Sequence, residues 1–132
     1  MTSDISRCYD LAMFKRFFCI LALILLLPVH AGEYEEALKY QDKVFLYLYS
    51  SDCGYCVKFD PVYKKLATIY GNQYKFVKIN TDTTYGRNLA GRLQVKYVPF
   101  VLITNKGKNE SALVAPQCIT NLACAENVLK NF

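Results

Sequence analysis

The sequence predicts an α/β fold in which a central mixed four-stranded sheet has helices on both faces. Strand-like apolar segments first alternate with helical segments, which favours parallel pairing of the early strands. Two later strand-like segments are separated by a short turn, which indicates an antiparallel hairpin. The composition of the 132 residues, 53% hydrophobic and 20% charged, is that of a single globular domain.

The predicted elements follow the order α-β-α-β-α-β-β-α. A helix is predicted over residues 33–40, because this segment has acidic residues at its start and a lysine near its end. Residues 44–49 are apolar on both faces, as in a central strand covered on both sides. Residues 50–52 supply turn and N-cap chemistry, so a long helix is expected over residues 53–70, with a kink at Pro61.

The second half of the chain supplies the remaining strands and helices. The expected elements are a strand over 74–80, a weaker helix over 83–93, a strand over 100–104, a turn over 105–108, a strand over 111–115 and a helix over 122–132.

The N-terminal segment has the pattern of a secretory signal peptide. Lys15 and Arg16 precede an unbroken apolar run over residues 17–27, and Pro28 ends this run. Small residues then lead to a cleavage position after Ala31. The pattern predicts export of the protein, to the periplasm or to another compartment outside the cytoplasm.

We therefore divide the chain into a signal peptide over residues 1–31 and a domain over residues 32–132, with Met13 as an alternative start. The apolar run is shorter than the about 18–20 residues of a membrane-spanning helix. No stable membrane span is expected after cleavage, and an uncleaved signal anchor is the alternative. The formal charge of +5 is scattered along the chain, so nucleic acid is not an expected partner.

Four of the six cysteines lie in the expected domain: Cys53, Cys56, Cys118 and Cys124. In an exported domain such cysteines are expected to be redox-active or bridging. The first two enclose Gly54 and Tyr55, follow the buried strand and open a helix. This setting favours thiol–disulfide exchange over metal binding.

The free N–H groups at a helix N-terminus stabilise a thiolate, so we expect Cys53 to be the nucleophile. Cys56 then resolves the mixed disulfide, and Gly54 and Tyr55 tune the reduction potential. A static Cys53–Cys56 disulfide and half of a zinc site are the alternatives. The wide spacing of the other two cysteines does not match a zinc partner pair, so no metal and no cofactor are expected.

Residues 44–107 resemble the thioredoxin superfamily, in particular its exported or periplasmic thioredoxin-like thiol–disulfide oxidoreductases. The matching features are the Cys53–Cys56 motif, Pro61, the segment over residues 78–82, and Val98-Pro99 before the third strand. The resemblance implies the thioredoxin fold. It also implies that the bond before Pro99 is cis and that Val98 and Pro99 bind substrate beside the cysteines.

The sequence departs from the family pattern at two positions near the motif. Asp52 stands where the family usually has tryptophan, and Tyr47 stands where it has a buried acid that assists proton transfer from the second thiol. Lys78 matches a lysine near that acid and is a candidate for proton handling, with an ordinary surface charge as the alternative.

Cys118 and Cys124 flank the start of the last helix, where the family usually has no cysteines. We expect a structural disulfide between them, and a second redox pair that relays electrons to Cys53 and Cys56 is the alternative. Tyr55 and Tyr97 are expected to be exposed near the active cysteines, where they would form a groove for an extended partner.

These observations predict a monomeric enzyme, a thiol–disulfide oxidoreductase of the protein disulfide reductase or isomerase type, with reductase activity favoured. Its expected partners are cysteine-containing exported proteins and an unidentified protein that recharges it. The alternative is a redox-inert binding or adaptor module with a structural Cys53–Cys56 disulfide.

Overall fold

A computed structural model describes residues 32–132, so the predicted signal peptide lies outside the described residues. The elements are α2 (Glu33–Tyr40), β1 (Lys43–Tyr49), α3 (Gly54–Tyr70), β2 (Lys75–Asn80), α4 (Thr84–Arg92), β3 (Phe100–Asn105), β4 (Glu110–Leu113), the 3₁₀ helix η1 (Pro116–Cys118) and α5 (Leu122–Asn131). Among residues 32–132, no helix is long and apolar enough to cross a membrane.

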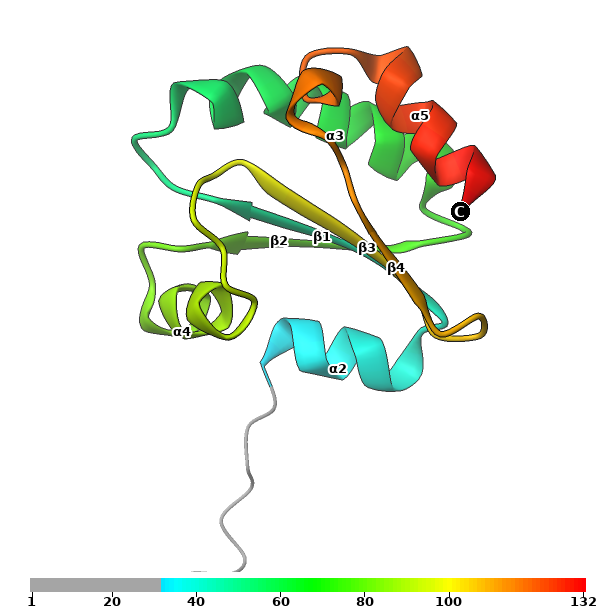
Figure 1. Ribbon diagram of the computed structural model, residues 1–132, viewed down its shortest axis with the longest axis horizontal. Helices are drawn as coiled ribbons and strands as arrows, with labels where there is room; N and C mark the ends of the chain where they lie inside the picture. The colour runs from blue at the N-terminus through cyan, green and yellow to red at the C-terminus, as the bar shows by residue number, and fades with distance from the viewer. Residues whose placement is uncertain (1–31) are drawn as a thin grey trace, which may run out of the picture. The chain divides into compact units, whose positions relative to one another are not determined.

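The strands form one four-stranded sheet in the order β2-β1-β3-β4. Strand β1 pairs in parallel with β2 and antiparallel with β3, and β3 pairs antiparallel with β4. Helices α3 and α5 cover one face of the sheet, and α2 and α4 cover the other (Figure 1). The predicted mixed sheet with helices on both faces is therefore confirmed.

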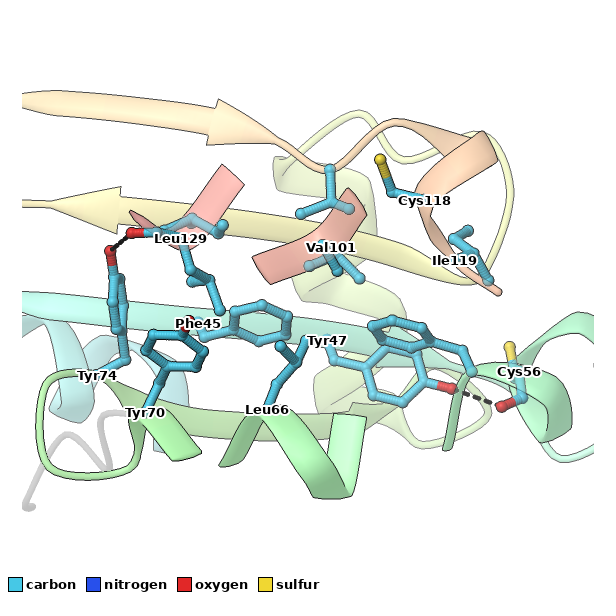
Figure 2. Packing of buried hydrophobic residues seen from close by; sticks show 14 residues of the cluster. Phe45, Tyr47, Cys56, Leu66, Tyr70, Tyr74, Val101, Cys118, Ile119 and Leu129 are labelled. Carbon is cyan, nitrogen blue, oxygen red and sulfur yellow. Dashed lines mark hydrogen bonds between the residues drawn. The ribbon is translucent and has the colours of Figure 1, made fainter. Parts of the chain in front are cut away.

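The central strand β1 supplies side chains to a core on each face of the sheet. Phe45 and Tyr47 point into the core under α3 and α5, where Leu66 and Leu129 join them (Figure 2). The alternate residues of β1 point into the second core, toward α2 and α4: Val44, Leu46 and Leu48. These five side chains of β1 are fully buried, which explains why the strand is apolar on both faces.

Several element boundaries differ from the predicted ones by one or two residues, and three of these differences have a clear physical reason. Helix α3 begins at Gly54, because Cys53 has extended backbone geometry and acts as the N-cap. Strand β2 begins at Lys75, while Tyr74 lies in the core and donates its hydroxyl hydrogen to the Leu129 carbonyl (3.0 Å). Strand β4 ends at Leu113, and the chain then enters η1 at Pro116, whose missing N–H prevents it from extending a ladder.

Candidate active site

Cys53 and Cys56 lie at the N-terminus of α3, directly after the turn that follows β1. The two residues form a disulfide, with their Cα atoms 5.2 Å apart. The backbone N–H of Cys56 donates to the Cys53 Sγ atom at 3.1 Å. This donor is one of the helix N-terminal N–H groups that have no partner within the helix, and it stabilises negative charge on Cys53 when the disulfide is reduced.

The two sulfurs differ in their access to solvent. The Cys56 residue is only 3% exposed and belongs to the core under α3, whereas Cys53 is partly exposed at its edge. A disulfide of another protein can therefore reach Cys53 more readily than Cys56. Between the cysteines, Gly54 has open space around its Cα and the Tyr55 side chain is 67% exposed.

The turn before Cys53 is tied to the end of β2 by polar contacts. The Ser51 N–H donates to Asp82 Oδ2 (2.8 Å), and the Asp82 N–H donates to Asn80 Oδ1 (2.8 Å). The hydrogen bond from the Ser51 backbone lowers the pKa of the Asp82 carboxyl below its ordinary value. These contacts fix the turn that leads from β1 to Cys53 at the start of α3. Asp52 lies exposed in the same turn.

The peptide bond between Val98 and Pro99 is cis, as the resemblance implied. Val98 is half-buried and packs against the same core as Cys53. Tyr97 is 69% exposed. Both Tyr97 and Pro99 line a groove of ≈ 510 Å³ that continues over the β3–β4 hairpin to the exposed side chain of Leu113.

Tyr47 and Lys78 converge on Asp60, a residue that the sequence analysis did not single out. The Lys78 ammonium lies 2.8 Å from Asp60 Oδ1, and the Tyr47 hydroxyl lies 3.2 Å from the same oxygen. Tyr47 Oη also lies 3.2 Å from the Cys56 carbonyl oxygen (Figure 2). A carboxylate is thus present near Cys56, although it comes from α3 rather than from β1. The signal that could have revealed it is the four-residue spacing from Cys56, which places both residues on one side of the helix.

Cys118 and Cys124 form a second disulfide, which joins η1 to α5 with the Cα atoms 5.0 Å apart. Cys118 is 4% exposed and lies in the same core as Cys56 (Figure 2). Within residues 32–132, the structure holds no group of three or more His, Cys, Asp or Glu residues able to bind a metal ion.

Comparisons with known proteins agree on one family. The family model described as "Thioredoxin" matches residues 26–125. The chloroplastic thioredoxin M-type of Brassica napus is 30% identical over 86 residues, which are 65% of this chain and 48% of that protein. Protein disulfide-isomerase A4 of Mus musculus is 31% identical over 78 residues, which are 58% of this chain and 12% of that protein. The chain therefore spans half or less of the length of these curated relatives.

Solved structures show the same fold. Mitochondrial thioredoxin 3 from Saccharomyces cerevisiae, in its oxidised form, superposes with a TM-score of 0.63 at 22% identity, over 76% of this chain and 88% of that one. The oxidised thioredoxin of Plasmodium falciparum gives a TM-score of 0.60 at 15% identity, over 76% of this chain and 90% of that one. The described residues therefore have the thioredoxin fold.

Proposed function

Because the chain belongs to the thioredoxin family, we propose that it is an exported thiol–disulfide oxidoreductase that reduces disulfides of other exported proteins. The observation that carries this proposal is the arrangement of the two cysteines. Cys53 is accessible at a helix N-terminus that stabilises its thiolate, and Cys56 is buried one helical turn behind it. This order of exposure suits an attacking and a resolving thiol.

The proposed reaction has two exchange steps. The Cys53 thiolate attacks one sulfur of the substrate disulfide, so that a mixed disulfide forms and the other substrate sulfur leaves as a thiolate. Cys56 then loses its proton and attacks Cys53 Sγ, which breaks the mixed disulfide and releases the second substrate thiolate. The substrate gains two electrons and two protons, and the protein is left with the Cys53–Cys56 disulfide. A dithiol-bearing exported protein would return it to the reduced state.

The surface beside the cysteines supports an extended polypeptide as substrate. By resemblance to the family, Val98 would bind the substrate segment through backbone hydrogen bonds, and the cis residue Pro99 would lie beside the cysteines. The exposed rings of Tyr55 and Tyr97 offer apolar contact area, and Tyr97 also lines the groove over the β3–β4 hairpin. We propose that the protein acts as a monomer and requires neither metal nor cofactor.

Export rests on the N-terminal sequence pattern and is tested separately. Mass spectrometry of the protein purified from its own host should show a chain that starts at Gly32. Fractionation of the same cells should place that chain outside the cytoplasm. If the purified chain still contains residues 17–27 and is found in the membrane fraction, the uncleaved signal anchor is supported instead.

The reductase activity is tested by turbidimetric reduction of insulin with dithiothreitol as donor. The wild type should accelerate precipitation, and both Cys53→Ser and Cys56→Ser should abolish this acceleration. In addition, Cys56→Ser should accumulate mixed disulfides on Cys53, which identifies the substrates. A wild-type protein that is inactive with every thiol donor would support the redox-inert adaptor. The measured reduction potential of the Cys53–Cys56 pair decides between reductase and isomerase roles.

A further inference from the structure

A small polar cluster lies between the sheet and α3, next to the buried cysteine. Its members are Tyr47 of β1, Asp60 of α3 and Lys78 of β2. Asp60 Oδ1 accepts from Lys78 Nζ (2.8 Å) and lies 3.2 Å from Tyr47 Oη. Tyr47 Oη lies equally close to the carbonyl oxygen of Cys56, so the cluster is connected to the residue that carries the second thiol.

The cluster holds its lysine in a defined position. The Lys78 ammonium lies 5.4 Å from the centre of the Tyr47 ring and 4.4 Å from that of Tyr49. The side chains of Lys78 and Asp60 are 30% and 36% exposed. The two rings attract the Lys78 ammonium and hold it in place, and the ion pair with Lys78 in turn holds the Asp60 carboxylate. Solvent still reaches this carboxylate because the side chain is partly exposed.

Of the groups in the cluster, Asp60 is the one whose carboxylate oxygens can act as a base. Burial and the charge of Asp60 raise the pKa of the Tyr47 hydroxyl, which therefore stays protonated and serves as a donor. Burial also raises the pKa of the neighbouring Tyr63, again with a contribution from Asp60. The charged and titratable groups around the carboxylate are thus Lys78, Tyr47 and Tyr63, with Tyr49 beyond the lysine.

We propose that Asp60 is the base that removes the proton of the Cys56 thiol during resolution, an inference that rests on the proposed function. Asp60 follows Cys56 by one helical turn, and its partly exposed carboxylate can act through one water molecule. The proton passes from Cys56 Sγ to the Asp60 carboxylate and then to solvent. The freed electron pair forms the Cys56–Cys53 bond as the bond between Cys53 and the substrate breaks. Tyr47 and Lys78 are positioning residues that hold the carboxylate.

This assignment explains why a tyrosine can occupy a position inside the sheet where the family has an acid. A carboxylate on β1 would be enclosed by the core, since Tyr47 is fully buried. Placed on α3, the carboxylate keeps contact with water and is charge-balanced by Lys78. The Tyr47 ring is buried in the core, and its hydroxyl connects β1 to α3.

The test isolates the resolution step. Reduced protein is treated at pH 4 with the 2-pyridyl disulfide of glutathione, so that thiopyridone release reports the attack by Cys53. A jump to pH 6–9.5 then starts resolution, and the loss of the glutathione adduct is followed by acid quench and mass spectrometry. For Asp60→Asn we expect resolution at pH 6.5 to slow by at least roughly 10-fold. The rates should converge with the wild type near pH 9.5, where hydroxide ionises Cys56 unaided.

Two further variants distinguish a loss of proton transfer from a non-specific loss of structure at the active site. Tyr47→Phe should shift the pH profile in the same direction by a smaller factor, because the carboxylate loses one of its two contacts. Asp42→Asn removes an exposed charge before β1 and should retain the wild-type profile. An Asp60→Asn profile equal to the wild type, or slowed by one factor at every pH, overturns the assignment. Failure of the wild type to form the adduct would instead overturn the proposed function.

Discussion

Tyr97 exposes a large apolar surface directly before the cis Val98–Pro99 bond. Its ring is 69% exposed and lines the groove over the β3–β4 hairpin. Aromatic residues often contribute much of the binding energy in protein interfaces. Tyr40 offers a matched comparison, because it is 67% exposed at the end of α2 and lies away from the groove.

We therefore predict that Tyr97→Ala lowers kcat/KM for insulin by roughly fivefold, corresponding to about 1 kcal/mol of lost binding. Reduction of a small disulfide such as 5,5′-dithiobis(2-nitrobenzoate) should be unchanged, because this molecule does not fill the groove. The control Tyr40→Ala should match the wild type with both substrates. Equal losses with insulin and with the small disulfide would indicate damage to the cysteines rather than lost substrate contact.

At the scale of single elements, the start of α4 packs against Asn80, the last residue of β2. Gly86 is buried, and a Cβ atom placed there would lie 1.9 Å from the Asn80 carbonyl oxygen. That oxygen accepts the Thr83 hydroxyl hydrogen (2.8 Å), and the Thr83 hydroxyl in turn caps α4 by accepting the Gly86 N–H (3.0 Å). A side chain at Gly86 would push α4 away from the end of β2.

Gly86→Ala should lower the free energy of unfolding by about 1–3 kcal/mol, measured by urea denaturation. Gly91 lies in the same helix, and a Cβ atom there would meet no atom within 4 Å. Gly91→Ala should therefore raise the free energy of unfolding by about 0.5–1 kcal/mol through helix propensity. Similar effects for the two substitutions would show that α4 does not pack on Asn80 as described.

The disulfide between Cys118 and Cys124 joins η1 to α5 and closes a short loop. Closing a loop of this size restricts the unfolded chain and is worth about 2–3 kcal/mol. We predict that the double variant Cys118→Ser, Cys124→Ser loses this stability but still reduces insulin at 25 °C. A folded double variant without activity would favour an electron relay between the two cysteine pairs.

A feature of the structure can be predicted from the sequence when the residues that form it lie close together in the chain. Strand β1 was predictable because an unbroken apolar run indicates burial on both faces of a strand. The end of β4 was not, because Pro116 starts a 3₁₀ turn that the alternating pattern does not show. Asp60 was missed because a carboxylate on a helix usually faces solvent. Its partners Tyr47 and Lys78 come from two strands that only the folded sheet brings together.

At the scale of the whole molecule, five tyrosines have a pKa that burial raises above its ordinary value. Burial raises the pKa of Tyr63 and of Tyr85 to about 12, from an ordinary value of 10.0. Burial also raises the pKa of Tyr34, Tyr47 and Tyr74. These residues lie in both cores or against them, so their ionisation is coupled to unfolding of the entire sheet and its helices.

The sign of this coupling follows from the direction of the shifts. Between about pH 10 and 12 the unfolded chain has lost tyrosine protons that the folded protein still holds. The unfolded state binds fewer protons there, so the free energy of unfolding falls as the pH rises, whereas this contribution is complete below pH 10. We predict a cooperative alkaline transition in which the part of the tyrosinate absorbance at 295 nm that comes from these five residues rises at the midpoint of the loss of far-ultraviolet circular dichroism. Tyr63→Phe should make the fall in stability with pH shallower. Full ionisation of the tyrosines before any loss of circular dichroism would show that their hydroxyls are open to solvent in the folded protein.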